Sequence, residues 1–324
     1  MTQTMLQLLQ SKTIVDCDTM DVEVPKVMGP FVDCTSNQAI AYMELIKPKH
    51  KSLIQDSVSK AKELNATFGE IPETELAVEI AMIKLQLAIV PYITGYVHVQ
   101  TNPKYSHVKD KTIANAIRIT KLFKSLDPDF DTTRVCIKIP STFAGLQACG
   151  ILESVHNITT LATTLFVIEQ AALAGEVGAH YIAPYVNELR VHFDPTFTDT
   201  HKAQRLCLEA QRYYEKYGYK TQVLPASLTS TEEIMELAGV HHITISPGLL
   251  KHLAEKKAED NNTMSIFEKA PDGFEVAGKM SFANDEEGYM RAFEKAIGGE
   301  AVRKLDDAIR IFSEMQDKFE ALMV

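Results

Sequence analysis

The stretch RVCIKIPSTFAGLQACGILES, residues 134–154, decides the fold because it contains a complete strand followed by a complete helix. RVCIKIP (134–140) is short, apolar and rich in β-branched residues, which is typical of a buried strand. TFAGLQACGILES (142–154) has the length and pattern of a helix. The same alternation continues along the chain on both sides of this unit.

Eight strand-like segments alternate with helix-like segments along most of the sequence. Strands are predicted at 13–18, 30–35, 94–100, 134–140, 159–166, 180–185, 220–226 and 241–247. Helices are predicted at 38–47, 73–90, 111–126, 142–154, 199–218, 229–239 and 246–260. This order predicts an α/β fold with a single (β/α)₈ barrel, the TIM barrel. The main alternative, a doubly wound open sheet, lacks its usual Gly-rich turn after the first strand.

The whole chain, 1–324, is predicted to form one domain with additional N- and C-terminal helices. The barrel covers about 13–254. The polar stretch 255–283 is broken by Asn, Pro and Gly, which indicates a loop. Residues 285–322 are predicted to form one or two helices that pack outside the barrel.

Composition excludes several classes of partner. Hydrophobic residues make up 45% of the chain, and 33 Lys and Arg against 43 Asp and Glu give a net charge of -10. That balance argues against nucleic acid and anionic membrane surfaces. We see no membrane-length apolar run and no signal peptide, and the five scattered cysteines suit neither a disulfide framework nor a zinc site. A reduced, cytoplasmic enzyme without a metal or cofactor is expected.

Lys138 is the sharpest candidate for chemistry. Strand alternation sends Ile137 and Ile139 to one face and Lys138 to the other, which in a parallel barrel is the interior. An amine desolvated in the barrel mouth favours its neutral form and can attack carbonyls. From the residues alone, a strand-end lysine that simply reaches water is the alternative.

Catalytic groups of such barrels lie at the carboxyl ends of the strands. Asp18 ends the first strand, where a carboxylate can move protons to and from substrate hydroxyls, although a turn or cap role is the alternative. The same rule selects a further set of strand-end residues: Thr35 to Asn37, Gln100, Thr163 and Tyr185.

The order of TIVDCDTMD, FVDCTSNQ, CIKIPSTFAG, ATTLF, YIAPYV, LPASLTSTEEIMELAG and ITISPGLLKHL resembles the transaldolase family, across most of 13–254. The resemblance implies that Lys138 is a Schiff-base lysine and Asp18 the general acid and base. It places Asn37 and Thr35 beside the substrate, Thr163 on the catalytic water and Ser227 at the end of the seventh strand. It also implies a small-molecule carbonyl substrate and a homodimer.

Three positions depart from transaldolases in the direction of the fructose-6-phosphate aldolases, which carry Gln, Tyr and Ala there. This chain has Gln100 where transaldolases have Glu, Tyr185 where they have Phe, and Ala183 where they have Ser. At these three positions the chain resembles enzymes that perform direct aldol addition and cleavage rather than group transfer.

The phosphate-binding positions depart as well. Family members use Arg after the sixth and seventh strands, where this chain has Glu188 and Thr229. Leu161 replaces a family asparagine on the fifth strand and makes the pocket less polar. A substrate that lacks a phosphate is therefore expected.

Three functions remain open from the sequence. The first is a Schiff-base aldolase or transaldolase-like enzyme that makes or breaks a C–C bond of a non-phosphorylated ketone or hydroxyketone. The second is a pentose-phosphate transaldolase that transfers a dihydroxyacetone unit between sugar phosphates. The third is a non-catalytic barrel that binds a ligand or partner, against which Lys138 and Asp18 argue.

Overall fold

A parallel eight-stranded sheet forms the centre of the computed structural model, which describes residues 3–324. The strands are β1 (Ile14–Asp18), β2 (Cys34–Thr35), β3 (Val97–Gln100), β4 (Val135–Pro140), β5 (Thr159–Leu165), β6 (Tyr181–Pro184), β7 (Gln222–Val223) and β8 (His242–Ile245). Each predicted strand region contains one of them. β2 and β7 are only two residues long, much shorter than the sequence predicted.

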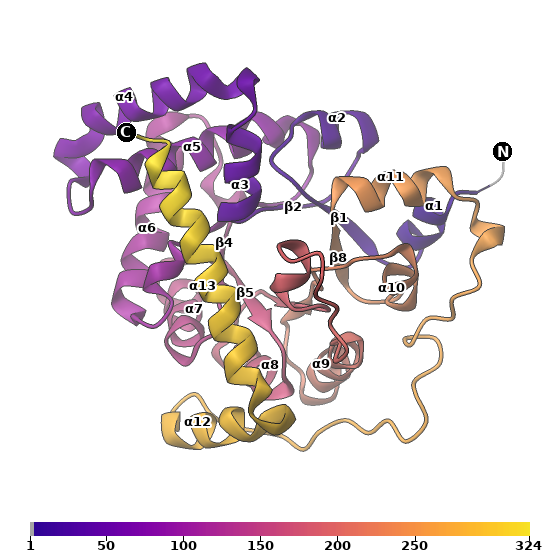
Figure 1. Ribbon diagram of the computed structural model, residues 1–324. Coiled ribbons are helices and arrows are strands. Elements are labelled where there is room, and N and C mark those ends of the chain that lie inside the picture. Colours follow the sequence, from indigo (N-terminus) through magenta and orange to yellow (C-terminus); the bar gives the residue numbers. More distant parts are fainter. Residues whose placement is uncertain (1–2) are drawn as a thin grey trace.

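The helices alternate with these strands and surround them (Figure 1). They are α1 (Met5–Gln10), α2 (Glu23–Met28), α3 (Gln38–Leu45), α4 (Lys51–Phe68), α5 (Glu73–Ile89), α6 (Lys109–Leu126), α7 (Phe143–His156), α8 (Ile168–Val177), α9 (Gln204–Tyr217), α10 (Thr231–Glu236), α11 (Pro247–Glu255), α12 (Glu286–Lys295) and α13 (Glu300–Ala321). The predicted helices correspond to α3, α5, α6, α7, α9, α10 and α11, whereas α2, α4 and α8 were not predicted.

The barrel closes in sequence order. Neighbouring strands pair in parallel from β1 to β7, and β8 pairs with β1. The backbone N–H of Thr244 donates to the carbonyl of Pro225 over 3.2 Å, which joins the β8 side to the segment after β7. The (β/α)₈ barrel predicted from the sequence is thus confirmed.

The 134–154 unit folds as its sequence requires. Ile137 and Ile139 are fully buried in the main core between strands and helices. Thr142 caps α7 by accepting a hydrogen bond from the backbone N–H of Gly145. A Cβ atom at Gly145 would collide with the carbonyl oxygen of Pro140, so the close turn from β4 into α7 requires glycine.

The last helix takes a course that the sequence did not reveal. α12 contacts α7 and α8 outside the barrel, as predicted. α13, in contrast, contacts α3, the 3₁₀ turns Pro103–Tyr105 and Leu189–His192, and β5. It therefore runs across the carboxyl-terminal face, and Figure 1 shows it in front of β4 and β5. Like α12 it packs outside the barrel, but it lies over the loops that rim the mouth, a position that the sequence did not specify.

Among residues 3–324, no helix combines the length and the apolar character that a membrane crossing demands.

Candidate active site

Lys138 lies on the inner wall of the barrel. Its side chain is 1% exposed. Its register partners are Gln100 on β3 and Leu161 on β5, so the three side chains share one face of the sheet. Within the described residues, no carboxylate lies within ion-pair distance of its Nζ. A buried, uncompensated amine at this position has the setting that carbonyl addition requires.

Gln100 and Thr163 carry polar atoms that nothing in the described chain satisfies. Gln100 is 1% exposed and Thr163 fully buried, yet both amide atoms of Gln100 and Oγ1 of Thr163 lack a hydrogen-bond partner. Buried polar groups are normally hydrogen-bonded, and exceptions point to an unfilled ligand or water site. Gln100 is the direct neighbour of Lys138 on β3, and Thr163 lies on β5 two residues beyond Leu161, on the same face of the sheet.

The backbone is irregular next to Thr163. The β5–β6 register shifts between Thr163 and Leu165, and Thr164 has a φ of 59°. Bulges and left-handed non-glycine residues cluster at functional sites, where they re-aim side chains.

Tyr185, Ala183 and Leu161 form the wall around the lysine. The Nζ atom of Lys138 lies 5.8 Å from the centre of the Tyr185 ring, close enough for a cation–π contact when the amine is charged. Ala183 and Leu161 are buried in a small apolar cluster inside the barrel, separate from the main core. They make this part of the barrel interior apolar.

Asp18 is held by hydroxyl groups. Thr35 Oγ1 donates to Asp18 Oδ1 over 2.7 Å, and the same hydroxyl lies 2.6 Å from Thr244 Oγ1. Thr35 and Thr244 are buried, whereas Asp18 at the end of β1 is half-buried. The arrangement orients one carboxylate oxygen and leaves the carboxyl group accessible from the mouth.

Asn37 combines a structural contact with a free donor. Its Oδ1 accepts the backbone N–H of Ile40 over 3.0 Å and so caps α3. Its amide nitrogen has no hydrogen-bond partner within residues 3–324. An amide fixed in this way can still donate to a substrate hydroxyl.

Ser227 and His192 form a pair at the rim after β7 and β6. Ser227 follows β7 with a left-handed φ of 61°, and its Oγ lies 2.9 Å from His192 Nε2. His192 ends the 3₁₀ turn after β6 and is exposed. Sequence reasoning missed His192, because only the fold brings the two loops together.

Glu188 and Thr229 face ionic groups of the rim. Glu188 is 5% exposed. Its carboxylate accepts hydrogen bonds from both terminal nitrogens of Arg303 in α13, with N–O distances of 3.0 and 2.8 Å. The hydroxyl of Thr229 donates to Glu233, whose carboxylate also binds Lys202. Arg303, Lys202 and Glu233 carried no signal in the sequence that linked them to the site.

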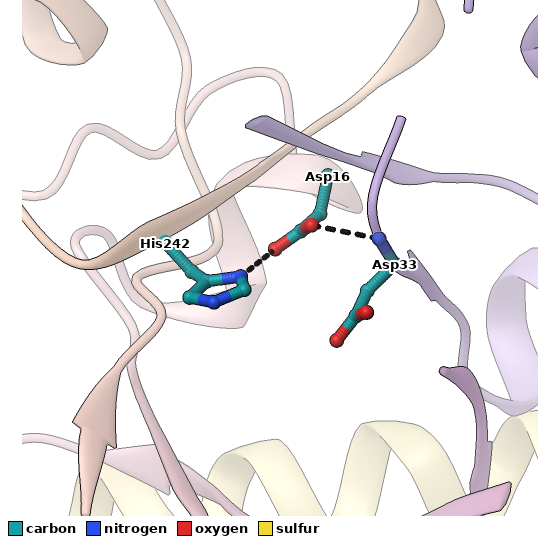
Figure 2. A group of neighbouring side chains, drawn as sticks. All are labelled: Asp16, Asp33 and His242. Carbon is teal, nitrogen blue, oxygen red and sulfur yellow. Dashed lines mark hydrogen bonds and ion pairs between the residues drawn. The ribbon is translucent and has the colours of Figure 1, made fainter. Parts of the chain in front are cut away.

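Deeper in the barrel, two carboxylates and two histidines form a buried network. His242 Nδ1 lies 2.9 Å from Asp16 Oδ2, and the other oxygen of Asp16 accepts the backbone N–H of Asp33 (Figure 2). Asp33 in turn lies 2.9 Å from His98 Nε2. His98 precedes Gln100 by two residues on β3 and shares its face of the sheet, but it lies in this deeper layer, where it is fully buried.

Burial dominates the titration of this network. Desolvation raises the pKa of Asp16 to about 7. Desolvation also lowers the pKa of His98, and the charge of Lys138 acts in the same direction. The pKa of His242 is raised, because its hydrogen bond to Asp16 and the charge of that carboxylate outweigh desolvation. Asp16 and His242 are therefore set to share a proton near neutral pH.

Asp16, Asp33 and His242 are also the described residues whose ligand atoms lie close enough together, within 4.8 Å, to hold a metal ion. Each carboxylate, however, already accepts hydrogen bonds with both of its oxygens: Asp16 from His242 and Asp33, and Asp33 from His98 and Tyr96. Each of the four carboxylate oxygens thus already has a hydrogen-bond donor. The cluster fits a proton-sharing network better than a metal centre.

Known proteins of one family match this chain along most of its length. The model of a family described as transaldolase/fructose-6-phosphate aldolase matches residues 15–322. A transaldolase of Kluyveromyces lactis is 31% identical over 306 residues, covering 93% of this chain and 89% of its own. Transaldolase B of Pasteurella multocida is 29% identical over 337 residues and 99% of each chain. A transaldolase of Actinobacillus pleuropneumoniae is 30% identical over 326 residues and 98% of each chain.

Proposed function

We propose, from the premise that the chain belongs to the transaldolase/fructose-6-phosphate aldolase family, that Lys138 is the nucleophile with which this enzyme forms its Schiff base. The observation that carries the proposal is a 1% exposed lysine beside two buried side chains, Gln100 and Thr163, whose polar atoms lack partners. A lysine that merely reached water would need neither the burial nor those neighbours.

The reaction begins when the neutral amine of Lys138 adds to a ketone carbon. Loss of water gives an iminium ion, which withdraws electrons from the adjacent bond. Asp18 takes the proton of the β-hydroxyl as the C–C bond breaks, which releases an aldehyde and leaves an enamine on the lysine. Proton return and water addition then free the second product and the amine.

Three residues manage water in this scheme. Gln100 and Thr163 hold the water used in forming and hydrolysing the Schiff base, through atoms that have no other partner. Tyr185 borders the same space and offers a hydroxyl that a phenylalanine would lack. The amide nitrogen of Asn37 binds a donor hydroxyl. Because Gln100, Tyr185 and Ala183 resemble the aldolase pattern, we propose direct aldol addition and cleavage as the main activity.

The substrate lacks a phosphate in this proposal. Two of the cations near the rim are already paired: Arg303 with Glu188 and Glu300, and Lys202 with Glu233. Lys304 lies 3.4 Å from Glu188 and 3.6 Å from Asp199. A phosphate would have to displace these carboxylates and would lose its own hydration beside their negative charges.

Arg190, two residues from Glu188, is the alternative source of the missing cation if the loop shifts, and its contacts argue against that role. It donates to Asp194 with two nitrogens and lies over the ring of Phe197 at 4.6 Å. Its guanidinium is therefore held away from a phosphate site by contacts within its own loop.

Pentose-phosphate transaldolase activity is the second candidate. It is favoured by relatives that carry the name transaldolase and match along nearly their whole length. A direct comparison separates the two: retro-aldol release and donor-to-acceptor transfer are measured with fructose 6-phosphate, sedoheptulose 7-phosphate and non-phosphorylated ketoses. We expect the non-phosphorylated compounds to react at the higher kcat/KM. Turnover of the sugar phosphates at ordinary transaldolase rates would contradict the proposal.

The homodimer and the cytoplasmic location stay predictions. Sedimentation equilibrium of the purified chain distinguishes a dimer from the monomer of 36.1 kDa.

A further inference from the structure

His192 stands at the mouth with one ring nitrogen engaged. Its Nε2 lies 2.9 Å from Ser227 Oγ, and Ser227 is fixed by a left-handed backbone at the end of the β7 segment. The amide of Asn187 binds the carbonyl of Ser227 over 2.9 Å. The Ser227 hydroxyl is thus held in one place by its backbone and by the imidazole.

The imidazole of His192 is also influenced by the charge of Asp18. Desolvation lowers the pKa of His192, and the carboxylates of Asp18 and Glu233 oppose that shift without reversing it. His192 is nonetheless exposed, so a ligand in the mouth can reach it. The imidazole is therefore neutral at pH 7, with one nitrogen that donates and one that accepts.

We propose that His192, together with Ser227, is a specificity-determining contact for the distal hydroxyl of the substrate. This rests on the proposed function, since it describes what occupies the end of the pocket where a phosphate would otherwise lie. A hydroxyl can donate and accept, so it pairs with a neutral imidazole and a serine hydroxyl in either tautomer. A phosphate dianion only accepts hydrogen bonds and would bring two negative charges toward Asp18 and Glu233.

The test uses aldol addition of dihydroxyacetone to glyceraldehyde, with glyceraldehyde 3-phosphate as the charged comparison. His192→Leu removes the contact, and His192→Gln restores an amide that can reach Ser227. His156→Leu, at the exposed end of α7, is the matched control for loss of a surface histidine.

We expect His192→Leu to raise the KM for glyceraldehyde about tenfold, the size of one lost hydrogen bond, with kcat changed less than about threefold. Borohydride trapping of dihydroxyacetone should give the same yield in His192→Leu as in the wild type, because the donor binds at Lys138. His192→Gln should recover part of the KM, and the control should behave like the wild type.

The outcomes separate the two proposals. If the wild type prefers glyceraldehyde but the KM for glyceraldehyde is the same in His192→Leu, only the proposal for His192 is overturned. A wild-type enzyme that prefers glyceraldehyde 3-phosphate overturns the non-phosphorylated substrate. An enzyme that traps dihydroxyacetone but adds it to neither aldehyde contradicts both.

Discussion

The unpartnered polar atoms beside Lys138 are the most informative feature at the scale of single residues. A core threonine or glutamine normally finds a hydrogen-bond partner, because burying an unsatisfied polar group costs about 1–3 kcal/mol. Gln100 and Thr163 have no partner for these atoms among the described residues, so water or substrate is what can satisfy them. This need connects the two residues to chemistry.

Removing the Thr163 hydroxyl therefore tests the water-handling role. We expect Thr163→Val to lower turnover about tenfold to a hundredfold through slower hydrolysis of the Schiff base, with no loss of stability. Rapid-quench measurement of adduct formation and release checks this. Thr160→Val, on the same strand but bonded to Glu153, is the control and should lose stability without losing turnover. Equal turnover in the two variants would contradict the assignment.

The inward direction of Lys138 could be predicted from the sequence because strand alternation is local and Ile137 and Ile139 fix it. Thr35, Gln100 and Thr163 followed from the rule that strand ends meet at one face. His192 could not, since its contact with Ser227 joins loops 35 residues apart that carry no shared pattern.

At the scale of elements, α5 and α6 are joined by a buried ion pair. Arg118 of α6 donates to Glu79 of α5 over 2.9 and 2.7 Å, and Asn115 also donates to Glu79. Burial raises the pKa of Glu79 to about 7 in spite of these partners. The pair matters because a buried carboxylate left without its guanidinium is strongly destabilising.

Arg118→Met should lower the free energy of unfolding by about 3–5 kcal/mol. Adding Glu79→Leu should recover most of that loss, because the uncompensated charge is then gone. Urea unfolding of the wild type, the two single variants and the double variant gives the coupling free energy between Arg118 and Glu79. A double variant no more stable than Arg118→Met would show that the charge is not what costs the stability.

α13 depends on a second buried cation. Lys304 is 4% exposed and donates to the carbonyl of His201 over 3.0 Å, beside Glu188 and Asp199. Lys304→Met should lower the free energy of unfolding by about 3 kcal/mol, because two buried carboxylates then lose a partner. It should also raise the KM of the substrate as α13 loosens over the mouth.

Lys318→Met, exposed on the same helix, is the control and should match the wild type in both measurements. If Lys304→Met is as stable as Lys318→Met, the ionic contacts do not hold α13 on the barrel.

The course of α13 also marks where sequence reasoning ended. Its length and amphipathic pattern predicted a helix, but the surface that receives it is assembled from turns after β3 and β6 and from α3. β7 is short as a regular strand, but its pairing with the β6 segment continues beyond it, where the backbone N–H groups of Leu224 and Ala226 donate to the carbonyls of Ile182 and Pro184.

At the scale of the whole molecule, the buried network at the base of the barrel couples stability to pH. Asp16 has a folded pKa of about 7 against an ordinary value of 3.8. As pH rises from about 4 to 7, the unfolded chain ionises this group while the folded chain must keep its proton. The contribution of Asp16 is thus fully present below about pH 4 and is lost as pH approaches about 7.

Asp16→Asn should therefore gain stability relative to the wild type between about pH 4 and 7, because the substituted amide does not titrate. Thermal unfolding at several pH values measures the difference. Asp110→Asn, exposed in the first turn of α6, controls for loss of a surface charge and should show no such trend. A difference that stays constant with pH would contradict the shifted titration.

We also propose that residues 1–324 form one domain, because α13 contacts elements from α3 to β5 and α1 contacts α11. The barrel and both ends should then unfold in one cooperative transition. Calorimetry that resolves two transitions would contradict this.

The central claim is that Lys138 forms the covalent adduct. Its most direct test is borohydride reduction of the enzyme with dihydroxyacetone, followed by peptide mass spectrometry. We predict one reduced adduct per chain, located on Lys138, and none in a folded Lys138→Met variant. An adduct on another lysine, or the same adduct yield in the variant, would contradict the account.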